Sequence, residues 1–144
     1  MKKYSFKNDY SEGAHPAILQ RLIDTNLEQT IGYGEDEFCN EARELIKKHL
    51  KKDAAIHFVS GGTQANLIVI SSILKPHESV IAAESGHIAV HETGAIEATG
   101  HKVNTIATDN GKITPEQISV VLATHTDEHM VKPKLVYISN STEV

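Results

Sequence analysis

Two glycines and a threonine separate a short apolar run from an apolar helical pattern in the segment 54–70. We expect a strand at 54–59, a tight turn at Gly61 and Gly62, and a helix that starts at Thr63. The first N–H groups of a helix lack intrahelical partners and carry the positive end of the helix dipole, so they bind anions. The spacing therefore predicts a phosphate site, to which the Thr63 hydroxyl could add a hydrogen bond. An ordinary turn in which Thr63 caps the helix is the alternative.

Nine histidines raise the question of a metal site. His87 with His91, and His125 with His129, have the i,i+4 spacing that can hold zinc on one face of a helix. Neither pair forms a His-Glu-x-x-His motif, and Cys39 is the only thiol. We therefore expect no metal, and we interpret the segment 125–130 as a solvated helix end and loop.

Three carboxylates are candidates for acid/base chemistry, and the favoured interpretation of all three is surface charge. They are Glu84, Glu92 and Glu97. Glu92 has a second interpretation, because it follows His87 by about one helical turn and could orient that ring.

Composition and charge exclude several classes of function. The chain has 144 residues, 40% of them hydrophobic, and a net charge of -5 without a basic cluster of the kind that binds nucleic acid. No apolar run approaches the ~20 residues of a membrane span, and the N-terminus lacks the apolar segment of a signal peptide. Cys39 excludes an internal disulfide framework and is interpreted as a packed thiol. We expect a soluble, cytoplasmic protein without nucleic-acid or membrane partners.

The hydrophobic periodicity predicts two helices followed by alternating strands and helices. Helices are expected at 15–29, 35–50, 63–74, 87–99 and 114–124, and strands at 54–59, 79–83, 102–107 and 133–139. The order αα followed by βαβαβαβ is typical of a mostly parallel sheet with helices on both faces and right-handed crossovers. The last strand leads into residues 140–144, where ligand-binding loops of such sheets begin. We therefore expect the chain to be the first part of a larger domain.

Four segments in the right order resemble the N-terminal part of the threonine aldolase and β-eliminating lyase family. Residues 6–10 (FKNDY) are similar to the family's LRSDT start, and 32–36 (GYGED) to its YGED element. Residues 61–66 (GGTQAN) are similar to its SGTMGN phosphate turn, and 85–95 (SGHIAVHETGA) to its HIxxxExGA helix start. The resemblance implies a pyridoxal-phosphate enzyme of the aspartate-aminotransferase fold. Residues 1–53 would form an N-terminal arm with helices, and 54–144 the first part of the large, cofactor-binding domain.

The resemblance also implies which residues hold the cofactor, pyridoxal 5'-phosphate. Its phosphate would rest on the backbone N–H groups of Gly62, Thr63 and Gln64, with the Thr63 hydroxyl contributing. His87 would lie over the pyridine ring, where it stacks and takes part in proton transfer. The family's Schiff-base lysine and the aspartate that pairs with the pyridinium nitrogen would lie beyond residue 144. We therefore expect this chain to be inactive by itself.

Substrate and subunit contacts follow from the same resemblance. Asn8 would lie near the substrate carboxylate, and Tyr33 would reach the active site of a neighbouring subunit in a homodimer or homotetramer. Three positions depart from the family pattern, because Lys7 replaces an arginine and Asn8 and Gly61 each replace a serine. Binding of substrate and cofactor could therefore differ from that of the aldolases.

The implied reaction is cleavage of a β-hydroxy-α-amino acid to glycine and an aldehyde. Two alternatives remain open. One is another reaction of the same fold type, either β-elimination or transamination. The other is a non-catalytic α/β module that binds a phosphate or a partner helix.

Overall fold

A computed structural model describes residues 4–5, 8 and 10–143. The chain divides into two compact units, Met1–Phe58 and Val59–Val144. No helix in the described part of the chain is long and apolar enough to cross a membrane.

The first unit contains two helices, α1 (Pro16–Thr25) and α2 (Glu37–Leu50). The His15 side chain accepts a hydrogen bond from Ala17 N at the start of α1, and Pro16 occupies its first turn. Asp36 caps α2 by accepting from Cys39 N at 2.8 Å. Both predicted helices are confirmed, although α1 ends at Thr25 rather than at residue 29.

Arg43 links the turn at Gly34 to the extended segment at Ile56 in the first unit. Its guanidinium donates to the carbonyl of Gly34 at 2.6 Å and to the carbonyl of Ile56 at 3.3 Å. The same group lies 5.5 Å from the centre of the Phe58 ring, within cation–π range. The strand predicted at 54–59 is therefore wrong. A strand needs a ladder partner, and the structure pairs no described segment with these residues.

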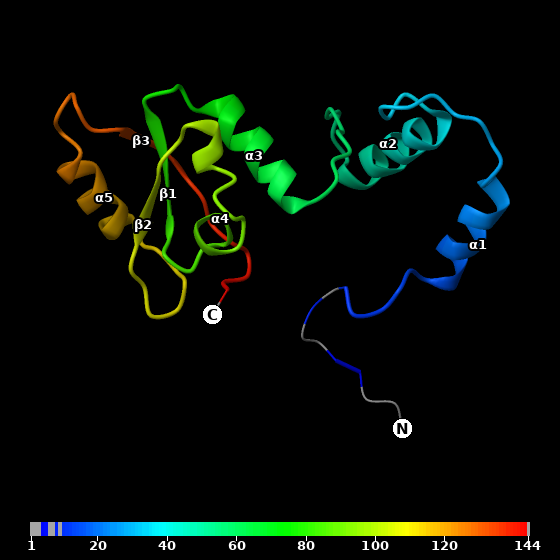
Figure 1. Cartoon of the computed structure of the whole chain (residues 1–144), viewed down its shortest axis with the longest axis horizontal. Coiled ribbons are helices and arrows are strands. Elements are labelled where there is room, and N and C mark those ends of the chain that lie inside the picture. Colours follow the sequence, from blue (N-terminus) through cyan, green and yellow to red (C-terminus); the bar gives the residue numbers. More distant parts are fainter. Residues whose placement is uncertain (1–3, 6–7, 9, 144) are drawn as a thin grey trace. The chain divides into compact units, whose positions relative to one another are not determined.

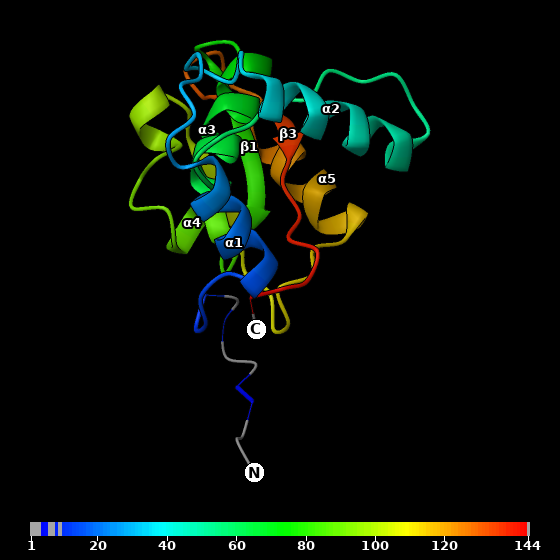
Figure 2. The same cartoon turned by 90° about the vertical axis from the view of Figure 1, so that its right-hand side faces the viewer.

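The second unit is a three-stranded parallel sheet with helices on both faces (Figures 1 and 2). The strand order is β2-β1-β3, and α5 lies on the side of the sheet opposite α3 and α4. This arrangement confirms the predicted fold class. The elements are α3 (Gly62–Ile73), β1 (Glu78–Ala83), α4 (His87–Val90), the 3-10 turn η1 (Glu97–Thr99), β2 (Val103–Ile106), α5 (Pro115–Thr124) and β3 (Lys132–Val136).

The core of this unit lies around the central strand, β1, whose six residues are all buried. On one face, Val80 and Ala82 belong to a cluster with Ile70 from α3 and Ile88 from α4. On the other face, Ile81 lines a cavity of about 380 Å³ together with residues of α5 and β3. Because β1 is central and buried on both faces, it fixes the position of the chain that leaves its carboxyl end.

The helix predicted at 87–99 is interrupted. It ends after one turn at Val90, and Thr93 and Gly94 then adopt positive φ angles of 54° and 74°. A left-handed backbone does not continue an α-helix, so the chain turns inward before η1 begins. The predicted final strand also changes its bounds, because β3 covers 132–136 rather than 133–139.

Glu78, at the start of β1, gives the fold a pH-dependent contact. Its Oε2 accepts a hydrogen bond from Lys75 N at 2.9 Å, and this bond lowers the pKa of the carboxyl group. A carboxyl whose pKa is lowered by folding stabilises the protein above its unfolded pKa and loses that contribution as pH falls through the folded value.

We therefore expect Glu78→Gln to lower the free energy of unfolding at pH 7, and we expect the difference from the parent to shrink below about pH 4. Urea unfolding at pH 7 and pH 3 measures both values, with the exposed Glu84→Gln as the control. A deficit that is equal at the two pH values would assign the effect to packing.

Candidate functional site

The N-terminus of α3 is open to an anion. Gly61 occupies the N-cap position, no side chain caps the helix, and Ala65 N makes the first hydrogen bond back to Gly61 O. The N–H groups of Gly62, Thr63 and Gln64 therefore have no intrahelical acceptor. A Cβ at Gly62 would meet no atom within 4 Å. Thr63 lies inside the first turn, so the alternative in which it caps the helix is wrong.

The Gln64 side chain forms hydrogen bonds with Ser60, in the loop that precedes α3. Its side-chain Oε1 accepts from Ser60 N at 2.7 Å and from Ser60 Oγ at 2.8 Å. Both bonds are made by the Gln64 side chain, so the backbone N–H of Gln64 still has no intrahelical acceptor in the first turn of α3.

A depression of about 510 Å³ lies between the start of α3, α4 and the segment that follows β3. Gly62 and Asn66 from α3 and His87 from α4 line one part of it, and residues 137–141 with Glu143 line the rest. The structure therefore brings Gly62 and His87, two of the predicted site residues, to one surface. Such a position, outside the carboxyl ends of parallel strands, is where α/β sheets bind their ligands.

Two polar side chains in this region, the partly buried Asn66 and the buried Glu92, were not predicted as residues of the cofactor site. Asn66 Nδ2 donates to Glu92 Oε1 at 2.6 Å, and His87 Nδ1 lies 2.9 Å from the same oxygen. The Glu92 side chain has no exposed surface, so its interpretation as a surface charge is wrong. The contact with His87 is present, whereas the orienting role in the second interpretation stays a prediction. The signal in the sequence is Thr93-Gly94, which interrupts the helix directly after Glu92.

Ser139 adds a hydrogen-bonding group to the depression. Its Oγ is buried and has no partner within the described residues. A buried hydroxyl without a hydrogen-bond partner is energetically unfavourable.

The predicted residues of the first unit have local roles in the structure. Asn8 Oδ1 accepts from Tyr10 N at 3.2 Å and from Ser11 Oγ at 2.6 Å, which closes a turn. Tyr33 is fully exposed, with a positive φ of 64°, next to the Gly34 carbonyl that Arg43 binds. Lys7 lies outside the described residues.

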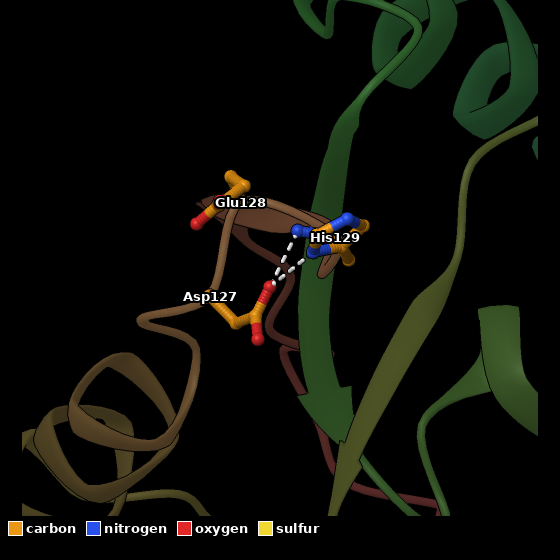
Figure 3. A group of neighbouring side chains, drawn as sticks. All are labelled: Asp127, Glu128 and His129. Atoms are coloured by element: carbon orange, nitrogen blue, oxygen red, sulfur yellow. Dashed lines mark hydrogen bonds and ion pairs between the residues drawn. The ribbon is translucent and has the colours of Figure 1, made fainter.

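His125 and His129, the second pair with i,i+4 spacing, bond to different groups in the structure. His125 Nδ1 bonds to Val121 O at 2.7 Å, whereas His129 bonds to Asp127 (Figure 3). Asp127 also accepts from the backbone N–H of His129, which is the main cause of its lowered pKa. Among the described residues, Asp127, Glu128 and His129 are the one group of three with ligand atoms in metal-binding range, and all three are exposed. Their contacts are those of a local turn.

Cys39 is partly buried in α2. A hydrogen bond to the Asp36 carboxylate is the main cause that raises the pKa of its thiol. A raised pKa keeps the sulfur protonated at neutral pH, which is typical of a packed thiol rather than of a nucleophile.

The three-stranded parallel sheet with helices on both faces places this chain in the α/β class, in which ligand sites lie outside the carboxyl ends of the strands. Within that class, the chain belongs to the beta-eliminating lyase family, whose model matches residues 7–144. This match confirms the resemblance drawn from the four sequence segments.

The chain is similar to individual threonine aldolases in sequence and in structure. The chain is 32% identical over 141 residues to a low specificity L-threonine aldolase of Pseudomonas sp., and 28% identical to one of Pseudomonas aeruginosa. Each alignment covers 96% of this chain and 41% of the relative, so the chain spans about two fifths of the length of these proteins. A solved structure of Leishmania major threonine aldolase is 55% identical, with a TM-score of 0.91 over 99% of this chain and 42% of that one.

Proposed function

We propose that this chain is the cofactor-binding portion of a pyridoxal-phosphate-dependent lyase that cleaves a β-hydroxy-α-amino acid to glycine and an aldehyde. The observation that carries the proposal is the depression that joins the open start of α3 to His87. The chain's similarity to threonine aldolases over 96% to 99% of its length supports the choice of reaction.

The residues at the start of α3 fit the phosphate of this cofactor. Three N–H groups point along the helix axis without an acceptor, no side chain competes as a cap, and Gly62 leaves room for close approach. Gly62, Thr63 and Gln64 would hold the phosphate oxygens, and the Thr63 hydroxyl would donate one more bond. When bound, pyridoxal phosphate supplies an electron sink for the electron pair of the broken carbon–carbon bond.

His87 is the side chain placed to act on bound groups in the depression. Its Nδ1 is occupied by Glu92, so Nε2 is the ring nitrogen left to exchange a proton. The flat imidazole can also stack on an aromatic ring and exclude water from one side of it. We assign His87 both roles, stacking and proton transfer at Nε2.

Asn8 and Tyr33 contribute from the first unit in this proposal. Asn8 would contact the carboxylate of a small amino-acid substrate. Tyr33, fully exposed on a turn that Arg43 holds, would enter the active site of a second copy of the chain in a homodimer or homotetramer. We also propose that the protein is cytoplasmic.

Analysis of the reaction products released by the complete protein distinguishes aldol cleavage from β-elimination. With threonine as substrate we expect equal amounts of glycine and acetaldehyde. β-Elimination, which the name of the matching family favours, would instead release ammonia and a 2-keto acid from serine or a related substrate. A protein that binds phosphate but turns over neither substrate would support the non-catalytic module, and transamination would be detected as amino-group transfer to a 2-keto acid.

We expect Thr63→Val in the complete gene product to weaken cofactor binding. A lost hydrogen bond to a charged phosphate costs about 1.5–3 kcal/mol, which corresponds to a rise in Kd of roughly 10- to 150-fold. Equilibrium dialysis or quenching of protein fluorescence by the cofactor measures the change. Thr105→Val, an exposed threonine of β2, is the matched control. Equal cofactor affinity of the two variants would remove Thr63 from the phosphate site.

A further inference from the structure

Glu92 is an acidic side chain enclosed by the protein next to the depression. Its side chain has no exposed surface, whereas the His87 side chain is 40% exposed. Oε1 receives hydrogen bonds from Asn66 and His87, and Oε2 is buried without a partner within the described residues. Burial of a carboxylate is unfavourable unless hydrogen bonds compensate for lost water. The two bonds to Oε1 therefore hold Glu92 in one position.

The backbone is strained where it places Glu92. The contact between His87 and Glu92 does not arise from one turn of a regular α-helix, as the sequence suggested, because the two residues are five positions apart and helical neighbours are three or four apart. The contact exists because α4 ends at Val90 and the chain then turns inward. Thr93, a β-branched residue, follows with a φ of 54°, and such residues rarely adopt this conformation. Strain of this kind persists where surrounding contacts over-determine it, and it is concentrated at functional sites.

The acceptor chemistry of Glu92 determines where the imidazole proton lies. A carboxylate only accepts hydrogen bonds, so His87 Nδ1 must carry a hydrogen to bond with it. In a neutral ring this leaves Nε2 with a lone pair. Asn66, the second donor, belongs to α3, whose first turn begins at Gly62 on the rim of the same depression.

We propose that Glu92 is a positioning residue that holds His87 in its Nδ1–H tautomer, so that Nε2 is the proton-accepting atom at the depression, and that Asn66 fixes Glu92 to α3. The tautomer assignment is independent of the reaction. The consequence for turnover rests on the proposed function, because it requires His87 to move a proton there.

The first test reads the tautomer of the chain directly. Nitrogen NMR of ¹⁵N-histidine-labelled protein, with the His87 signal assigned by its loss in His87→Gln, reports which ring nitrogen is protonated at a pH where the ring is neutral. We expect protonation at Nδ1. Protonation at Nε2 in the unaltered chain would overturn the proposal, and this measurement requires no variant of Glu92 to fold.

Glu92→Gln then isolates the effect of the carboxylate. A neutral amide can present either an acceptor or a donor to the ring, and it lacks the charge that strengthens the bond. We expect the ratio of Nδ1–H to Nε2–H forms to fall by roughly tenfold or more. Glu97→Gln, an exposed glutamate on η1, should leave the ratio unchanged. Equal ratios in the two variants would contradict the role of Glu92.

The second test measures turnover by the complete gene product loaded with cofactor. Glu92→Gln is expected to lower kcat by about 10- to 100-fold, a part of the 10²- to 10⁴-fold that proton transfer contributes. KM and cofactor Kd should change less than threefold, because the Glu92 side chain has no exposed surface with which to bind substrate or cofactor. An altered tautomer with an unaltered kcat would overturn the positioning role. Inactivity of the unaltered enzyme would reject the proposed function and leave the tautomer result standing.

Discussion

Replacement of His87 by alanine in the complete gene product is expected to lower kcat by about 10²- to 10⁴-fold, the range for a lost proton-transfer group. His87 lines the depression, and its ring is held through Nδ1 by Glu92, which leaves Nε2 for chemistry. His91 is the matched control. It lies at the end of α4, is exposed, and does not line the depression, although its ring centre is 5.5 Å from that of His87. We expect His91→Ala to change kcat by less than threefold.

A second substitution separates the two roles given to His87. Phenylalanine keeps a flat ring for stacking and removes both nitrogens, so His87→Phe should retain cofactor affinity and lose turnover. Steady-state kinetics and cofactor titration of the three variants provide the comparison. Equal kcat values for His87→Ala and His91→Ala would show that α4 contributes only packing.

The 144-residue chain by itself is expected to form no stable covalent adduct with pyridoxal phosphate and to show no aldolase activity. The reaction needs a lysine that attaches the cofactor and a partner for its pyridinium nitrogen. None of the described lysines lines the depression that contains Gly62 and His87. Non-covalent binding of phosphate at the start of α3 should persist, because that site uses local backbone N–H groups.

Borohydride reduction followed by peptide mapping tests this expectation. A complete site would give one modified lysine per chain, and an incomplete one gives scattered, substoichiometric labelling. Stoichiometric labelling of one lysine, together with release of glycine from threonine, would show that the chain contains a complete site. The complete gene product, treated in parallel, is the positive control.

Local sequence signals predicted most of the secondary structure. Asp36 and Thr114 mark helix starts because their side chains bond to backbone N–H groups two or three residues later, an interaction that needs no distant partner. Pro16 and Gly100 mark a helix start and a turn end for equally local reasons. The alternation of strands and helices expected from residue 54 onward predicted the parallel sheet, which has three strands rather than four among the described residues.

Errors arose where a distant contact decides the local structure. The apolar run 54–59 has the composition of a strand. In the structure, however, the Ile56 carbonyl accepts a hydrogen bond from Arg43, and the run pairs with no strand within the described residues. Apolar composition predicts burial in either case, so it does not distinguish a strand from an extended segment.

The sequence by itself determined the family and the sheet class, because both depend on motifs and on an alternation of elements that can be read along the chain. It predicted a turn and a helix start near Thr63, but the structure decided that α3 begins at Gly62 without a side-chain cap. Tertiary structure decided that Glu92 is buried and bonded to Asn66 as well as to His87, whereas the sequence offered the contact with His87 only as the less favoured interpretation. Asn66 and Glu92 are 26 residues apart, and their contact forms because α3 and α4 pack on the same face of β1. A polar side chain buried between two packed elements no longer bonds to water, so it needs hydrogen-bond partners from the other element. The spacing of residues along the chain does not specify those partners.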